Sequence, residues 1–310
     1  MKNFINLKDI PAKDLRKILN DAKKRKNKRK KLSTLDVDKD KPLKGKLLIQ
    51  MYEKPSSRTR LSFHLSINQL GAGSITINAN ELHLGKGGES LSDTAKILST
   101  YGDGFLLRTG SDKKIENFSK DLTIPIINLL SPSSHPCQVL SDVFTVEEIK
   151  KKPISKLNIC WIGDSNNVLN SLIATSVKFK FNLNIGCPKK YRPPKFVMNW
   201  VKKNKRKINI FHDPKKAVEN ADVIFSDKVV SLNDKVNKVK KLKDFKNYRI
   251  NSSLMKKTKK NSTIFLHCLP RGNEVSEEVF FGKQSRVWQQ ALNRVHVQKS
   301  ILLYCFGKLR

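Results

Sequence analysis

Residues 54–60, which read KPSSRTR, combine small hydroxyl side chains with two arginines at the predicted start of a helix. They follow an apolar strand-like run. The free N–H groups and positive dipole at a helix start bind anions, and a guanidinium such as that of Arg58 pairs well with phosphate. A plain helix cap is the alternative for such a turn, but the clustering of hydroxyls and arginines favours a site for a phosphate-sized anion.

A second group of polar residues occupies positions 134–138, SHPCQ, after another apolar run. Pro136 suits the first helical position, so we expect His135 just before the helix and Gln138 in its first turn. A neutral imidazole and an amide suit a carbonyl or amide group better than a phosphate, although a capped helix with a surface histidine is the alternative. Arg108 ends a third apolar run, where a charged side chain needs a partner or a ligand.

The second half of the chain carries three further candidates. Asn167 stands at a predicted helix start and could bind a carboxylate, and Asp227 ends a strand-like run and could bind an amine; helix or turn caps are the alternatives. Residues 267–270, HCLP, end another run, and the Cys268 thiol could hydrogen-bond an incoming amine. No second histidine lies at ligand spacing from His267, so we predict no metal site.

The elements that carry these residues alternate between strand-like and helical patterns. Strands are predicted over residues 47–52, 74–78, 104–107, 126–130, 157–162, 183–186, 208–211, 223–225 and 263–266, and helices over 58–70, 90–101, 136–150, 167–179, 196–203 and 285–306. This rhythm predicts an α/β fold with two doubly wound parallel-sheet domains joined by helices. A charged, proline-containing segment at 147–155 divides residues 1–150 from 151–284. The last helix is expected to bury one apolar stripe.

Composition narrows the function classes. The 62 Lys and Arg residues against 27 Asp and Glu give a net charge of +35 over 310 residues. The basic residues are scattered, and the densest run, 23–31, has no interleaved aromatic residue to stack bases. We therefore read these residues as a solvated surface and expect no specific nucleic-acid binding, only weak binding of polyanions at low salt. Residues 85–90, GKGGES, lack phosphate-loop spacing and predict a loop near the active site, not an ATP site.

The sequence also predicts where the protein is located and how its cysteines are used. No apolar run reaches the roughly 18 residues that a membrane span needs, and the first residues lack a signal-peptide core, which predicts a cytoplasmic protein that binds no membrane. Five cysteines without a CxxC pair favour neither a disulfide framework nor a cysteine zinc site.

The motifs SSRTR, HPCQ and HCLPR, in this order, resemble those of the aspartate/ornithine carbamoyltransferase family along essentially the whole chain. The cysteine in HCLPR resembles the ornithine carbamoyltransferases, since the aspartate carbamoyltransferases typically carry proline at that position. The resemblance implies transfer of a carbamoyl group from carbamoyl phosphate to the side-chain amine of L-ornithine, giving citrulline and phosphate in arginine biosynthesis. It implies no cofactor and no metal, and a homotrimer whose subunits share active sites.

The resemblance also implies the roles of individual residues. The first domain, completed by the terminal helix 285–310 crossing back to it, would bind carbamoyl phosphate, and the second would bind ornithine. The matching carbamoyl-phosphate contacts are Ser56, Ser57, Arg58, Thr59, Arg108, His135, Gln138, Cys268, Leu269 and Arg294, and the matching ornithine contacts are Asn167, Asp227, Ser231 and Leu232. The catalytic set would be Arg108, His135, Gln138, Asp227 and Cys268. A cis peptide is implied between Leu269 and Pro270.

One segment departs from the family pattern. A Ser-Met-Gly loop preceded by Trp is usual after the aspartate, whereas residues 228–233 here read KVVSLN, with Leu232 for Met and Asn233 for Gly. Leucine keeps the volume of methionine. The loop could therefore still close over substrate, but the departure from the family pattern leaves another amine, such as N-acetylornithine or putrescine, as the alternative acceptor. A noncatalytic polyanion-binding protein is the alternative from another class, and the complete set of site residues speaks against it.

Overall fold

The structure, a computed structural model, describes residues 1–78, 88–230 and 237–309. The chain divides into two compact units, Met1–Ser141 with Leu292–Arg310, and Asp142–Ala291. Two helices, α5 (Pro136–Lys150) and α12 (Val287–Cys305), each contribute residues to both units. The last helix thus returns to the first unit, as predicted.

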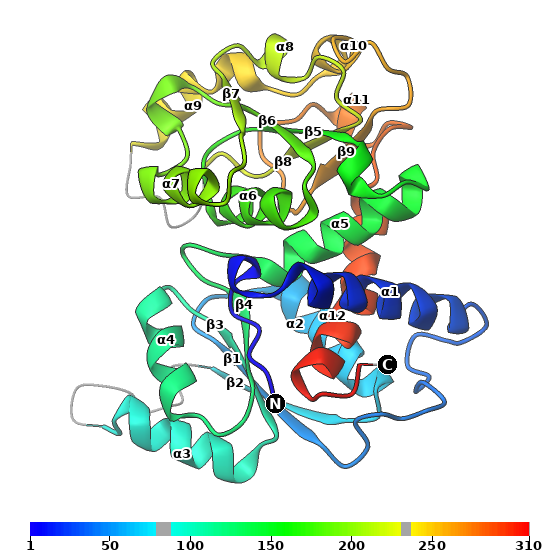
Figure 1. The fold of residues 1–310 in the computed structure, drawn as a ribbon, viewed down its shortest axis with the longest axis vertical. Coiled ribbons are helices and arrows are strands. Elements are labelled where there is room, and N and C mark those ends of the chain that lie inside the picture. The colour runs from blue at the N-terminus through cyan, green and yellow to red at the C-terminus, as the bar shows by residue number, and fades with distance from the viewer. Residues whose placement is uncertain (79–87, 231–236, 310) are drawn as a thin grey trace. The chain divides into compact units, whose positions relative to one another are not determined.

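The first unit is built on a four-stranded parallel sheet in the order β2-β1-β3-β4. Its strands are β1 (Leu47–Tyr52), β2 (Gly73–Asn78), β3 (Gly104–Arg108) and β4 (Ile126–Leu130), and its helices are η1 (Leu7–Asp9), α1 (Ala12–Lys28), α2 (Ser57–Gln69), α3 (Leu91–Tyr101) and α4 (Asp112–Asp121). Apolar residues of α3 and α4 form one core cluster with β1, β3 and β4. Figure 1 shows α1, α2 and α12 on the other side of this sheet.

The second unit is built on a five-stranded parallel sheet in the order β7-β6-β5-β8-β9. Its strands are β5 (Asn158–Ile162), β6 (Asn182–Gly186), β7 (Asn209–Phe211), β8 (Val223–Ser226) and β9 (Ile264–His267). Its helices are η3 (Ile154–Lys156), α6 (Asn167–Phe179), η4 (Lys189–Tyr191), α7 (Lys195–Lys203), α8 (Pro214–Ala217), α9 (Lys238–Asp244), η5 (Lys246–Tyr248), α10 (Ser252–Lys256) and α11 (Glu277–Phe280). Helices α8, α10 and α11 pack on one face, and α6 and α7 lie on the other (Figure 1). Two doubly wound parallel sheets confirm the predicted fold class.

Each sheet has one point at which the strand order reverses. It lies between β1 and β3 in the first unit and between β5 and β8 in the second. Open α/β sheets bind ligands beyond the carboxyl ends of strands at such a point, because the loops there diverge and leave a crevice. The segments that follow these strands carry most of the residues predicted to do chemistry.

The terminal helix corrects one prediction. Instead of burying a single apolar stripe, α12 is buried on every side from Asn293 to Cys305, polar residues included. Lys299 is fully buried, and its ammonium lies 3.0 Å from both carboxylate oxygens of Asp38. Arg29 and Arg25 approach the same carboxylate, at 2.8 and 3.2 Å. Two arginines of the basic run 23–31 are therefore internal, not part of a solvated surface.

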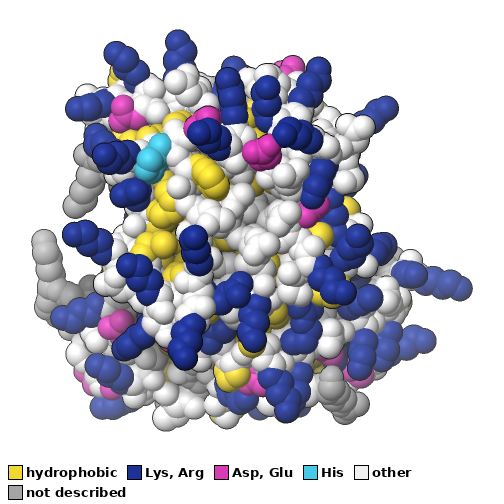
Figure 2. Space-filling view, turned by 45° about the horizontal axis from the view of Figure 1, so that its top comes forward, with side chains coloured by type: hydrophobic (Ala, Val, Ile, Leu, Met, Phe, Trp, Pro, Cys, Tyr) yellow, Lys and Arg dark blue, Asp and Glu magenta, His cyan; other side chains and the backbone are white. Residues whose placement is uncertain are grey.

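The remaining basic residues lie largely on the outside. Figure 2 shows Lys and Arg side chains spread over the visible face rather than gathered in one stripe. Within the described ranges, no helix combines the length and the apolar character that crossing a membrane requires.

Candidate active site

The turn between β1 and α2 leaves a helix N-terminus without a side-chain cap. Ser56 is the N-cap residue of α2, yet its side chain accepts no hydrogen bond from the helix. Instead, its hydroxyl accepts from Nη1 of Arg108 at 2.9 Å. Arg108 ends β3, directly beside Tyr52 at the end of β1. The sheet thus brings a guanidinium against a helix start where Ser57 and Arg58 occupy the first two positions, an arrangement suited to an anion.

Arg108 is mostly buried and, among the described residues, pairs with no carboxylate. Its Nε has no hydrogen-bond partner there. Burial lowers the pKa of Arg108, and the nearby Arg58 lowers it further. A guanidinium stays charged in proteins, and a buried charge without a partner is costly. The position therefore calls for a negatively charged ligand.

A second buried arginine comes from the terminal helix. Arg294 is 3 % exposed, and its Nη2 donates to the hydroxyl of Thr59 at 2.8 Å. Thr59 itself is 2 % exposed and lies in the first turn of α2. Residues 235 positions apart in the sequence are thereby joined, and Thr59 is held in place beside the helix start.

His135 directly precedes α5, which begins at Pro136 as predicted, and Gln138 lies in its first turn. Both are buried. Burial lowers the pKa of His135 well below its ordinary value, and the charges of Arg294, Arg108 and Arg58 lower it further. The imidazole is therefore neutral at physiological pH and can donate one hydrogen bond without adding a charge.

Two residues of this half-site were not found from the sequence. Glu53 accepts hydrogen bonds from Thr109 Oγ1, the Gly110 N–H and the Lys114 ammonium, which ties the segment after β3 to the end of β1. Burial raises the pKa of Glu53, but the bonds from Lys114 and Thr109 outweigh it, so the net pKa is lowered. Tyr52 donates to Gln50 at 2.9 Å. Gln50 is the one polar residue inside the apolar run 47–52, and it is the sequence feature from which these residues could have been found.

In the second unit, the turns after β5 and β8 meet. Asn166 caps α6 by accepting from the N–H groups of Val168 and Leu169, and its Nδ2 donates to Asp227 Oδ2 at 2.7 Å. Asn167 is the first residue of the helix, so the cap role that was an alternative for Asn167 belongs to its neighbour. Ser231 and Leu232, together with Asn233, lie outside the described residues, as do residues 85–87 of the glycine-rich segment.

The turn after β9 carries Cys268 and Leu269. The Leu269 N–H donates to Nδ1 of His267 at 3.0 Å, and Nε2 of the same ring lies 3.1 Å from Glu274. His267 therefore holds the turn and is not exposed to a ligand. The peptide bond between Leu269 and Pro270 is cis, as the family resemblance implied. Cys268 is partly exposed, whereas Cys137, Cys160, Cys187 and Cys305 are buried.

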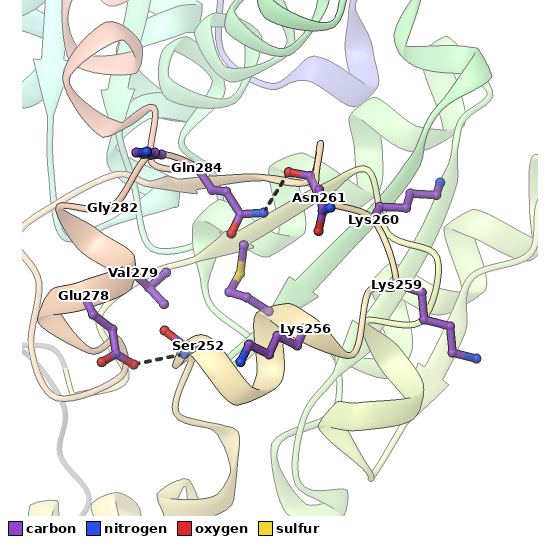
Figure 3. Close-up of a pocket in the computed structure, with 11 residues that line it drawn as sticks. Ser252, Lys256, Lys259, Lys260, Asn261, Glu278, Val279, Gly282 and Gln284 are labelled. Carbon is purple, nitrogen blue, oxygen red and sulfur yellow. Dashed lines mark hydrogen bonds between the residues drawn. The ribbon is translucent and has the colours of Figure 1, made fainter.

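One pocket of the second unit lies apart from the predicted site residues. A pocket of about 460 Å³ in the second unit is drawn in Figure 3 and contains none of the predicted site residues. Lys259 and Lys260 lead away from it in that view, and they pair with Glu219 and Asp222. Within the described ranges, no three His, Cys, Asp or Glu side chains are grouped as a metal site would require.

Comparison with known proteins covers both units. The family model for the carbamoyl-P binding domain of aspartate/ornithine carbamoyltransferase matches residues 2–148, and that for the Asp/Orn binding domain matches residues 155–305. An ornithine carbamoyltransferase of Agrobacterium fabrum is 39% identical over 308 residues, covering 99% of this chain and 98% of its own. One of Rhodopseudomonas palustris is 41% identical, with 99% and 97% covered.

Solved structures agree with these matches. The ornithine carbamoyltransferase from Pyrococcus furiosus superposes with a TM-score of 0.91 at 35% identity, covering 100% of this chain and 98% of that one. The anabolic enzyme from Campylobacter jejuni gives 0.88 at 32% identity, with 99% and 100% covered. The resemblance found in the motifs is confirmed, and the chain belongs to the aspartate/ornithine carbamoyltransferase family.

Proposed function

We propose that this protein transfers the carbamoyl group of carbamoyl phosphate to the side-chain amine of L-ornithine, forming L-citrulline and phosphate. The observation that carries the proposal is Arg108, a largely buried guanidinium without a carboxylate partner among the described residues, bonded to the N-cap serine of a helix start. Relatives of full length at about 40% identity that are named ornithine carbamoyltransferases support ornithine as the acceptor. N-acetylornithine, putrescine and polyanion binding are not favoured.

Carbamoyl phosphate would bind mainly to the first unit, Met1–Ser141 with Leu292–Arg310, for which the sequence predicted residues 1–150 with 285–310. Arg58, Arg108 and the N–H groups of Ser56, Ser57 and the following turn would hold the phosphate. This is an anion at a helix N-terminus reinforced by guanidinium groups. The uncapped α2 start and the Arg108–Ser56 bond support this role.

The carbamoyl carbonyl would be polarised by neutral donors beside the arginines. Thr59, Arg108 and His135 would stabilise the oxyanion that forms when nitrogen attacks the carbon. A neutral His135 suits this role, because it donates a hydrogen bond and its lowered pKa makes it a weak base toward the amine. Gln138, Arg294 and the Leu269 carbonyl would orient the carbamoyl group. Removing one oxyanion donor of this kind typically costs about 10²–10³ in kcat.

Ornithine would bind in the second unit, Asp142–Ala291, for which the sequence predicted residues 151–284. Asp227 would accept from an amine, Asn167 would bind the carboxylate, and Ser231 and Leu232 would complete the contacts. The bond from Asn166 to Asp227 supports this assignment, because it fixes the carboxylate beside the start of α6. Cys268 would accept a hydrogen bond from the attacking amine, whose ammonium proton passes to solvent before the neutral nitrogen attacks the carbon. The phosphate leaves with the C–O bond electrons, and the proton of the nitrogen passes to phosphate or solvent.

Assembly and setting complete the proposal. We propose a cytoplasmic homotrimer with shared active sites that serves arginine biosynthesis. Sedimentation equilibrium would test the trimer, which requires a mass of about 106 kDa, three times the 35.4 kDa of the chain. A mass of 35 kDa at assay concentration would contradict it.

A steady-state assay with a panel of amines tests the function. Citrulline and phosphate should form in equal amounts from carbamoyl phosphate and ornithine. Turnover with N-acetylornithine or putrescine should be at least about 100-fold less efficient, about 2.7 kcal/mol of discrimination. No turnover of ornithine with any carbamoyl phosphate concentration would reject the proposal, and a better acceptor in the panel would replace ornithine. The variant Arg108→Met should lose activity while keeping its circular dichroism spectrum.

A further inference from the structure

Helix α9 contains one buried lysine among exposed ones. Lys241 has a side chain only 4% exposed, while its neighbours Lys240 and Leu242 face solvent. Its ammonium lies 2.5 Å from Oδ2 of Asp164, which is itself 16% exposed. The Tyr191 ring covers the same ammonium, with its centroid 5.8 Å away. Burying a lysine is costly unless its partner is held in good geometry, so we expect this pair to have a role other than stability.

Asp164 sits at the centre of the turn after β5. Its carbonyl accepts from Nε1 of Trp161 at 3.1 Å, and its Oδ1 accepts from the Ser165 N–H at 2.8 Å. Lys241 takes the second carboxylate oxygen. Each oxygen of Asp164 thus accepts a hydrogen bond, and the turn leads directly into Asn166.

Asn166 connects the turn to the residues proposed to bind the amine substrate. It caps α6 with its Oδ1 and donates to Asp227 with its Nδ2 at 2.7 Å. Fixing the turn therefore fixes the Asp227 carboxylate and the position of Asn167. Lys241 also neutralises Asp164, a second carboxylate two residues from Asn166 that would otherwise compete with Asp227 for a cationic amine.

We propose that the Lys241–Asp164 ion pair is a positioning device for the amine substrate: it sets the geometry of Asn166 and Asp227 and removes a competing negative charge. The inference rests on the proposed function, in which Asp227 and Asn167 bind ornithine. Lys241 and Asp164 are positioning residues, because they act through Asn166 and touch no substrate themselves. The device is selective for one substrate, since neither Asn166 nor Asp227 is assigned to carbamoyl phosphate, whose phosphate group is assigned to residues of the first unit.

The test compares how variants change the KM for ornithine and the KM for carbamoyl phosphate. Lys241→Met removes the charge while keeping most of the side-chain volume, and it should raise the KM for ornithine by about 10- to 100-fold, the cost expected when a substrate-binding group is displaced. The KM for carbamoyl phosphate should stay within twofold. Lys241→Arg restores the charge and should return the ornithine KM to within about threefold of the unmodified protein. Equal rises for both substrates, or an unchanged ornithine KM in folded Lys241→Met, would overturn the inference.

Two control variants separate this effect from charge and from stability. Lys240→Met removes the same charge from an exposed position on the same helix and should leave both KM values within twofold. Lys260→Met breaks another lysine–aspartate pair of the unit, with Asp222 at 2.7 Å, and should do the same. A control that raised the ornithine KM as much as Lys241→Met would overturn the inference.

A second variant covers failure to fold. If Lys241→Met does not give a native circular dichroism spectrum, Asp164→Asn replaces it. That change keeps an acceptor for the Ser165 N–H but removes the charge, and it should raise the ornithine KM selectively; an unchanged KM would overturn the inference. If the unmodified protein uses another amine, the proposed acceptor is wrong, and the same comparison is made with the amine that it accepts.

Discussion

Replacing Lys299 by methionine should stabilise the protein at neutral pH. Burial lowers the pKa of Lys299 from 10.5 to about 8, although Asp38 raises it and the nearby Arg29 and Arg25 lower it again. A pKa lowered by about 2.5 means that holding the charged lysine in the fold costs about 3 kcal/mol. Asp38 keeps Arg25 and Arg29 as partners when the lysine is removed, so no carboxylate is left unpaired.

The stability difference between Lys299→Met and the unmodified protein should depend on pH. Above the folded-state pKa of about 8 the native protein releases this proton, while the unfolded chain holds it up to about 10.5. The unfolded state then binds more protons, so the stability of the unmodified protein rises with pH across this window. The advantage of Lys299→Met should fall from about 3 kcal/mol at pH 7 to about 1 kcal/mol at pH 9.5 and vanish above pH 11.

Urea unfolding at these pH values, followed by circular dichroism, measures the difference, since urea adds no ionic screening. A companion variant, Asp38→Asn, should destabilise, because it leaves Lys299 and two arginines buried without their shared carboxylate. If Lys299→Met is less stable than the unmodified protein at pH 7, the ion pair is a net source of stability and the reasoning is refuted.

Three further outcomes concern the candidate site. Arg108→Met should lower kcat/KM for carbamoyl phosphate by about 10²–10³ or more, and a loss below tenfold in steady-state assays would remove Arg108 from the phosphate site. Burial and three arginines lower the pKa of His135 well below its ordinary value, so its ring proton resonances should not titrate at the ordinary histidine midpoint of about 6.5, and an NMR titration with a midpoint there would contradict this. Burial raises the pKa of the Cys137 thiol to about 12 and of Cys187 to about 11, so an aromatic disulfide reagent should label Cys268 alone in the native protein, and Cys268→Ser should abolish fast labelling.

The parts of the fold with strong local signals were predicted well. Helix α5 spans the predicted range 136–150, because Pro136 marks its first position, and α6 spans 167–179, because Asn166 caps it. The strands β1 and β4 also match their predicted ranges. Binding turns followed from the same logic, since parallel strands bring their carboxyl ends to one edge of each sheet.

Interactions between distant residues were not predictable in this way. Lys241 lies in a run, residues 238–244, whose lysines look alike in sequence, and only its partner, 77 residues away, distinguishes the buried one. The same holds for Arg25 and Arg29 in the basic run near the start of the chain. Periodicity reports which face is apolar, but it carries no information on which polar residue finds a counter-ion inside.

The broad distribution of lysine and arginine over the surface has a kinetic consequence for the two proposed substrates. A net charge of +35 creates a long-range field that draws a phosphorylated anion inward from solution and opposes the approach of a cationic amino acid. Salt weakens both effects. Capture of the first substrate would therefore slow, and entry of the second would quicken, as ionic strength rises, so that the order of the two encounters depends on the electrolyte around the protein.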